Sequence, residues 1–292
     1  MILDLPNAST ADKQHYLQHA IAPRPICFAS TINKAGLVNL SPFSFFNLFS
    51  IEPPILIFSP SRRIRNNTIK HTLENVMEVP EVVIHIVDYA MVWQASLSSC
   101  EFPREVNEFK KAGFTEEPAA LVRPPMVKES KIKFECKVEG IQSLGESGGS
   151  GNLVICRILR MHIDDSILDD KNKIDQRKIH HVARMGGDWY CKVDEHNLFT
   201  VHKPTTELGI GIDALPASIR QSRVLSGNHL GQLANIEGLP NPDPAFENPR
   251  LREIFQYFAI NPEELEREIH LYAASLLNEG RTREAWLVLL SI

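Results

Sequence analysis

The sequence has no stretch near the roughly 20 consecutive apolar residues that a membrane-spanning helix requires. Its first residues carry neither the basic segment nor the apolar segment of a secretory signal. It also has no excess of positive charge, since 31 Lys and Arg stand against 36 Asp and Glu, a net charge of −5. Sequence-independent binding to nucleic acid requires a basic surface. We therefore expect a cytoplasmic protein that binds neither membrane nor nucleic acid.

The sequence has few cysteines, and their spacing gives no sign of pairs. The five cysteines are odd in number, and none forms a C-x-x-C pair. Cys27, Cys136 and Cys156 each lie in a strand-like run. Free cysteine behaves as a small core hydrophobe, so the pattern predicts buried, reduced thiols rather than disulfides or a metal site.

Several catalytic and nucleotide-binding motifs are missing. There is no His-Glu-x-x-His, and His180-His181 has no partner at the spacing of metal ligands. The glycine-rich stretch 145–151 lacks the Gly-Lys-Ser/Thr ending of a P-loop, and it precedes a strand rather than a helix. Its Gly-Gly-Ser-Gly run does not have the Gly-x-Ser-x-Gly spacing that surrounds a serine nucleophile. Gly209-Ile-Gly211 lacks a surrounding βαβ unit. We expect a hairpin loop at 145–151 and no metal, P-loop or Rossmann site.

What the sequence does contain is a β-rich part followed by a helical part. Its 292 residues allow one large domain, or one domain with an extension. Apolar and β-branched runs bounded by turn residues predict strands at 25–32, 37–40, 55–59, 82–87, 131–141 and 152–163. Helical spacing predicts helices at 68–78, 89–98, 249–259, from 261 to about 276, and at 282–290. We predict a six- or seven-stranded antiparallel barrel with side helices over 1–203 and a loop-rich helical extension over 204–292.

A polar cluster follows the second predicted strand. Between Asn39 and Asn47, small hydroxyl and amide side chains alternate with Pro and Phe. Such a stretch leaves backbone groups open to a planar, hydrogen-bonding heterocycle, while aromatic side chains supply an apolar wall. The alternative is a turn whose phenylalanines lie in the core.

Positive charge collects shortly afterwards. Lys70-His71-Thr72 lies in the first turns of a predicted helix, and Arg62, Arg63 and Arg65 precede it. A helix N-terminus offers free N–H groups to an anion, although a solvated basic loop is the alternative. Three or four phosphate contacts at ~1.5–3 kcal/mol each do not supply both the roughly 4–15 kcal/mol that association costs and the net of about 8 kcal/mol that micromolar affinity requires. A buried apolar ring must supply the remainder, which favours a phosphorylated aromatic ligand such as FMN.

These stretches together resemble the flavin-reductase-like, FMN-binding split-barrel family. The resemblance covers about 20–203 and keeps its order and spacing. The residues that carry it are Ala22–Thr31, Asn33–Asn47, Pro53–Ser59, Lys70–Asn75, Glu108–Thr115, the Gly-Asn-Leu-Val-Ile stretch from Gly151 and the Met-Gly-Gly-Asp-Trp-Tyr stretch from Met185.

The resemblance implies a mainly β fold with helices and a split-barrel homodimer with FMN at the dimer interface. The residues that match the family's flavin-ring stretch are Asn39, Leu40, Ser41, Pro42, Phe43, Ser44 and Asn47. Those that match its phosphate side or border the cleft are Ser59, Arg65, Lys70, His71, Thr72, Arg24, Gly186, Gly187 and Tyr190. Many relatives have Asp where this chain has His71. Longer bacterial relatives carry stretches similar to Leu225–Leu230.

The implied activity is an FMN-dependent oxidoreductase, in which NADH or NADPH gives a hydride to flavin N5. The acceptor is then a small molecule or a free flavin. Such chemistry needs no protein nucleophile because the cofactor carries it, and His71 and His181 are candidate proton-transfer residues. Two alternatives stay open. One is an FMN-binding electron-transfer protein or specialised flavoenzyme that does not use free NAD(P)H, and the other is a non-catalytic barrel that binds another ligand.

Overall fold

The computed structural model describes residues 1–202, 204, 208–243 and 245–292. The chain divides into two compact units, Met1–Phe199 and Thr200–Ile292. The predicted division after residue 203 falls on Lys203, which lies outside the described residues, and it stays a prediction. No helix among the described residues is both long and apolar enough to cross a bilayer.

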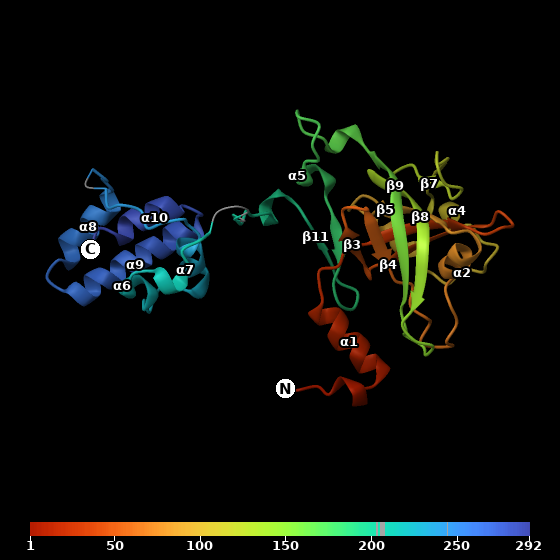
Figure 1. Cartoon of the computed structure of the whole chain (residues 1–292), viewed down its shortest axis with the longest axis horizontal. Helices are drawn as coiled ribbons and strands as arrows, with labels where there is room; N and C mark the ends of the chain where they lie inside the picture. The colour runs from red at the N-terminus through yellow and green to blue at the C-terminus, as the bar shows by residue number, and fades with distance from the viewer. Residues whose placement is uncertain (203, 205–207, 244) are drawn as a thin grey trace. The chain divides into compact units, whose positions relative to one another are not determined.

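The first unit is built on one seven-stranded sheet in the order β2-β1-β5-β8-β9-β4-β3. Every neighbouring pair is antiparallel. The strands are β1 (Cys27–Ile32), β2 (Val38–Phe43), β3 (Phe46–Ser50), β4 (Ile55–Phe58), β5 (Glu81–Ile86), β8 (Ile132–Ser143) and β9 (Asn152–Ile163). Although β2 and β3 are consecutive in the chain, they lie at opposite edges of the sheet. The fold is therefore a split β-barrel with side helices (Figure 1).

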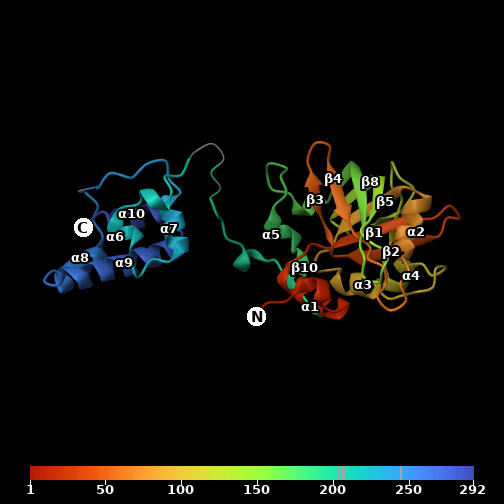
Figure 2. The same ribbon diagram turned by 60° about the horizontal axis from the view of Figure 1, so that its bottom comes forward.

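Short elements surround this sheet. The helices of the first unit are α1 (Thr10–Ala20), α2 (His71–Glu78), α3 (Val92–Leu97), α4 (Glu108–Ala112) and α5 (Gln176–Ile179). Two small ribbons pair β6 (Glu116–Glu117) with β7 (Met126–Val127), and β10 (Val182–Arg184) with β11 (Tyr190–Lys192). Helix α2 contacts β1 and β2, and α4 contacts β2 (Figure 2). This packing brings the start of α2 beside the strand that carries Asn39.

The interior of the barrel is apolar. One buried cluster joins Leu73 and Val76 of α2 to side chains of β1, β4, β5, β8 and β9. The three cysteines predicted to be core residues, Cys27, Cys136 and Cys156, are buried free thiols, and that prediction is confirmed. Burial raises the pKa of all three thiols, so they stay protonated.

All six predicted strands are present, with ends shifted by a few residues, and β8 pairs with β9 across the 145–151 loop as expected. Among the α-helices and strands of the first unit, those that were missed are α1, which buries none of its side chains, α4, α5, β3 and the two ribbons β6–β7 and β10–β11. The predicted start of α2 at Thr68 was wrong. The backbone at Lys70 is extended (φ −82°, ψ 148°), and this residue is the N-cap of a helix that begins at His71.

His85 on β5 is a fully buried histidine held by two hydrogen bonds. Because a carbonyl only accepts, its Nδ1–H donates to Phe28 O over 2.7 Å, and its Nε2 accepts from Val127 N–H over 2.9 Å. Burial lowers the pKa of His85 from 6.5 to about 3, against a smaller opposing effect of the Phe28 hydrogen bond. The neutral ring is thus part of the folded state.

This burial makes stability depend on pH. Between pH 6.5 and 3 the unfolded chain binds a proton at residue 85 that the folded chain does not, so stability falls as the pH falls. The contribution is about 1.4 kcal/mol per pH unit, or roughly 2 kcal/mol between pH 6.5 and 5. We expect the free energy of unfolding, measured with urea, to fall more steeply with falling pH in the native chain than in a His85→Gln variant. The two slopes should differ by about 1.4 kcal/mol per pH unit. Equal slopes would contradict a neutral, buried His85.

The second unit, Thr200–Ile292, is helical. Its helices are α6 (Ala217–Arg220), α7 (Gly227–Ala234), α8 (Pro249–Phe258), α9 (Pro262–Asn278) and α10 (Thr282–Leu289). The unit has its own apolar core, which includes Leu233, Ile269 and Trp286. Asn261 caps α9 by accepting a hydrogen bond from Glu264 N–H, with Pro262 at the first helical position. The three helices predicted from 249 onward are confirmed, whereas α6 and α7 were not predicted.

Candidate functional site

A small pocket lies at the start of α2, against β2 and the segment after α3. Five residues from the predicted flavin stretches line it together: Asn39, Ser41, Lys70, His71 and Thr72. The remaining lining residues are Arg63, Ser98, Ser99, Cys100, Glu101, Phe102 and Glu108. The cavity between them is about 20 Å³, which is room for a single water molecule. The two predicted stretches thus meet in space, as a shared ligand site requires.

A buried hydrogen-bond network forms the floor of this pocket. Thr72 Oγ1 donates to Asn39 Oδ1 over 2.6 Å, and Asn39 Nδ2 donates to Glu108 Oε1 over 2.8 Å. The other oxygen of Glu108 accepts from Leu40 N–H at 3.1 Å. Burial raises the pKa of Glu108, while its hydrogen bonds from Leu40 and Asn39 work in the opposite direction. Asn39 and Thr72 therefore bind each other, which restricts the rotamers of both side chains beside the pocket.

Three positively charged side chains lie near the Glu101 carboxylate: Arg63, Arg65 and Lys70. Arg63 Nε lies 3.3 Å from Glu101 Oε1, and Arg65 Nη2 lies 2.6 Å from Glu101 Oε2. Lys70 also lines the pocket, and no carboxylate lies within 4 Å of its ammonium among the residues that the structure describes. Burial lowers the pKa of Lys70, the charge of Arg63 lowers it further, and Glu101 opposes both. Arg63 and Arg65 are thus paired with Glu101, and Lys70 lines the same pocket, which the Glu108 carboxylate also lines.

The basic segment 62–65 is held rigidly by its neighbours. The Arg63 guanidinium donates to Thr68 Oγ1 and Ile69 O. The glycine-rich loop docks on the same segment, with Arg62 N–H donating to Ser150 O over 2.8 Å and Gly149 N–H to Arg62 O over 3.0 Å. A Cβ at Gly148 would lie 3.0 Å from the Ile64 backbone. The glycines thus allow two backbones to approach closely, and the stretch is the hairpin loop that the sequence predicted.

His71 stands at the first position of α2 and is half-buried. Burial lowers its pKa, and the charges of Arg63 and Arg104 lower it while Glu74 and Glu105 oppose them. The imidazole is therefore held in its neutral form near pH 7. A neutral ring at the pocket edge is able to accept a proton.

A second group of predicted residues collects around Arg24. The buried Arg24 side chain donates to Gln18 O, Ile21 O and Met185 O, and its Nε lies 3.5 Å from Ser44 Oγ. Gly186 lies against the His19 ring, where a Cβ would stand 2.3 Å from ring carbons, and Gly187 has a φ of +57°. Arg24 thus ties the end of α1 and the late glycine loop to the end of β2.

The other predicted residues have varied places. Leu40 and Phe43 lie in the core, so only their backbone groups face outward, and Pro42 between them is half-buried. Ser59 Oγ accepts from Asn152 N–H, while the exposed Asn47 bonds to the Leu48 N–H beside it. Tyr190 stacks under the Arg184 guanidinium at 4.6 Å. His181, half-buried in an isolated bridge with Asp88, does not line the pocket, and burial lowers its pKa.

Sequence reasoning missed the acidic residues of the site. Glu101 and Glu108 reach the pocket from segments that are 36 residues beyond Arg65 and 69 residues beyond Asn39. Their contacts arise only when α3 and α4 pack beside β2. Glu108 does belong to a stretch that carries the family resemblance, and this was the one available signal.

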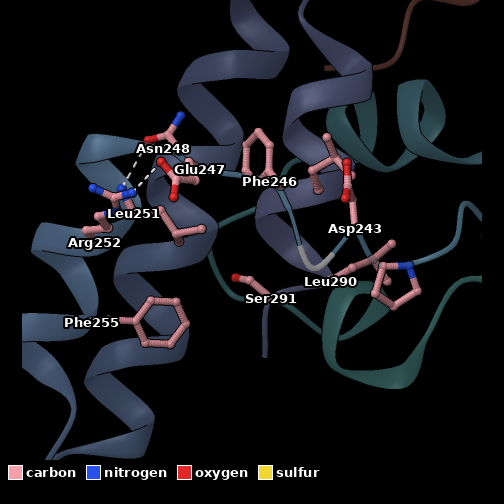
Figure 3. Close-up of a pocket in the computed structure, with 11 residues that line it drawn as sticks. Asp243, Phe246, Glu247, Asn248, Leu251, Arg252, Phe255, Leu290 and Ser291 are labelled. Carbon is pink, nitrogen blue, oxygen red and sulfur yellow. Dashed lines mark hydrogen bonds and ion pairs between the residues drawn. The ribbon is translucent and has the colours of Figure 1, made fainter.

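The second unit holds a pocket of its own, of about 380 Å³ (Figure 3). Phe246, Phe255 and Leu290 are among its apolar lining residues, and an ion pair of 2.5 Å joins Arg252 to Glu247 at its side. No sequence motif pointed to this pocket. Among the described residues, no group of three or more His, Cys, Asp or Glu is arranged to hold a metal ion.

Comparison with known proteins agrees with this architecture. Residues 19–181 match the family described as flavin reductase like domain, and the chain belongs to that family. It is 36% identical to an uncharacterized protein of Halalkalibacterium halodurans over 207 residues, which cover 70% of this chain and 97% of that protein. An uncharacterized protein of Aquifex aeolicus is 38% identical over 172 residues, 59% of this chain and 85% of that protein.

Solved structures show the same fold. Nitrilotriacetate monooxygenase component B from Bacillus cereus superposes with a TM-score of 0.64 at 27% identity, covering 69% of this chain and 98% of that one. The 2-nitrobenzoate 2-nitroreductase NbaA of Pseudomonas fluorescens gives a TM-score of 0.63 at 23% identity, covering 72% and 100%. The predicted split barrel is thereby confirmed.

Proposed function

We propose that this chain binds FMN and acts as a flavin reductase, with NADH or NADPH as the electron donor. The observation that carries the proposal is that Arg63 and Lys70 line one pocket with Asn39 and Ser41 of β2, in a chain of the flavin reductase-like family. Arg65 does not line this pocket, but it pairs with Glu101, which does. A phosphate monoester fits this set, since guanidinium groups donate in forks and a lysine supplies a point charge. When bound, the isoalloxazine ring supplies the hydride acceptor at N5.

The chain's own residues would position that cofactor. The cations at the start of α2 hold the phosphate, and the helix N-terminus adds free N–H groups. Strand β2, about 20 Å long at 3.3 Å per residue, leads from this end toward Ser44, where Arg24 approaches. The Glu108 carboxylate keeps the Asn39 amide oriented and so shapes the site wall. His71, held neutral, is the candidate proton acceptor at the pocket edge.

The direct test is anaerobic reduction. Purified protein with FMN is mixed with NADH or with NADPH, and the absorbance of oxidised flavin is followed. Rapid bleaching with either donor supports the reductase. Retention of FMN with bleaching only by dithionite would favour a flavoprotein that does not use free NAD(P)H. The separately folded unit Thr200–Ile292 is the feature that motivates this second candidate. A protein that does not bind FMN would favour the third candidate, a non-catalytic barrel that binds another ligand.

We also propose that the protein is a homodimer with the flavin site at its interface. Support comes from the edge strand β3 and its ends, where Phe45, Leu48, Phe49 and Ile51 are 44, 48, 64 and 74% exposed. Exposed large apolar side chains in such a strip along an edge strand are typical of a protein–protein interface.

A charge placed in this strip is expected to break the dimer. We expect Phe49→Glu to run as a monomer in analytical ultracentrifugation and to lose flavin affinity along with the dimer. The control is Trp93→Glu on α3, where the side chain is 84% exposed outside the strip; it should leave the mass unchanged. A native chain that is monomeric at tens of micromolar would refute the proposal.

A further inference from the structure

The Glu101 carboxylate is paired with two cations of the proposed phosphate site. Its two oxygens lie 3.3 Å from Arg63 Nε and 2.6 Å from Arg65 Nη2, and Lys70 lines the same cavity. The cavity beside them is about 20 Å³, room for about one water molecule. An anion that binds the same guanidinium groups must therefore take the place of the carboxylate.

The Arg63 side chain is held more firmly than the Glu101 side chain, and this difference allows an anion to replace the carboxylate. The Arg63 side chain is 14% exposed and fixed by Thr68 and Ile69, so it stays in place when its carboxylate partner leaves. The Glu101 side chain is 48% exposed and has only ion-pair contacts to Arg63 and Arg65 among the described residues. It is able to turn into solvent at small cost, because exposed ion pairs contribute little to stability.

We propose that Glu101 is an internal competitor for the phosphate site and thereby determines which flavins bind. The inference rests on the proposed function. A phosphate monoester carries −1.5 to −2 charges and three acceptor oxygens, so it replaces a carboxylate of charge −1 on the same cations. Riboflavin has no such group and leaves Glu101 in place. The competitor therefore lowers the affinity for every phosphorylated ligand by a common factor and leaves unphosphorylated ligands unaffected.

The test compares the native chain with Glu101→Gln, which keeps the shape of the side chain and removes its charge. Dissociation constants for FMN and riboflavin are measured by fluorescence titration, and thermal shifts are measured with inorganic phosphate. We expect FMN to bind roughly 3- to 10-fold more tightly to the variant, since each exposed ion pair shifts an equilibrium by up to about fivefold. Riboflavin affinity should not change. The control is Asp170→Asn, an exposed carboxylate outside the pocket with no cation within 4 Å among the described residues; it should change FMN affinity by less than twofold.

Each outcome decides the inference. Tighter FMN binding in Glu101→Gln alone supports it, and unchanged or weaker FMN binding overturns it. If neither protein binds FMN but phosphate raises the melting temperature of the variant more than that of the native chain, the proposed function is wrong and the role of Glu101 as a competitor is supported. If neither protein binds FMN and phosphate stabilises both chains equally or not at all, the role of Glu101 is refuted as well.

Discussion

Lys70→Ala is expected to raise the dissociation constant for FMN by about 10- to 150-fold. The reason is the loss of one charge-assisted hydrogen bond of ~1.5–3 kcal/mol to the phosphate. Lys70 is half-buried and has no carboxylate within 4 Å among the described residues, so its charge is not already neutralised by a bound partner. Fluorescence titration with FMN at fixed ionic strength measures the change.

Two further variants make that result specific. Lys70→Arg keeps the positive charge and should restore most of the affinity. Lys137→Ala removes a lysine from an exposed position of β8 and should leave the dissociation constant unaltered. Riboflavin, which lacks the phosphate, should bind Lys70→Ala as it binds the native chain. A change of less than threefold for FMN in Lys70→Ala would remove this residue from the site.

Trp286→Ala is expected to cost the second unit about 3–5 kcal/mol of stability. The side chain is 2% exposed in the core of Thr200–Ile292, and its Nε1–H donates to Leu233 O over 3.2 Å. Removal leaves both a cavity and an unpaired carbonyl. Calorimetry should show the transition of this unit at a much lower temperature or absent altogether. Tyr257→Ala, at a side chain of α8 that is 74% exposed, is the control.

The same variant separates the roles of the two units. Each unit has its own buried core, and the residues of the proposed phosphate site all belong to Met1–Phe199. We therefore expect Trp286→Ala to bind FMN as the native chain does. An increase in turnover with NADH after this change would favour the second candidate, a flavoprotein that does not use free NAD(P)H in its native form. Lost FMN binding would contradict a site confined to the first unit.

The sequence predicted best those elements in which apolar residues recur at one regular spacing. The sequence of β8 has apolar residues at every second position from Ile132 to Val138, and α9 has a clear cap and apolar spacing, so their positions were close to those observed. Helix α1 has no buried side chain, and most of β3 faces solvent. Neither element has the apolar periodicity that single-sequence reasoning depends on.

The site was predictable to the extent that its residues lie close together in sequence. The charge of Lys70 and the amide of Asn39 were visible, and the structure brings both into one pocket. Glu101 was not predictable because a carboxylate facing Arg63 and Arg65 depends on how the segment after α3 folds back. The same is true of the Asn39–Thr72 hydrogen bond, which occupies two side chains that were expected to face the ligand.

The most direct measurement is a parallel titration of the native protein with FMN and with riboflavin. If the phosphate is held by Arg63, Arg65 and Lys70, FMN should bind at least about tenfold more tightly, since one net charge-assisted contact supplies that factor. The difference should narrow as salt is added, because the cations are partly exposed. Equal affinities for the two flavins, or a protein that takes up neither, would contradict the account.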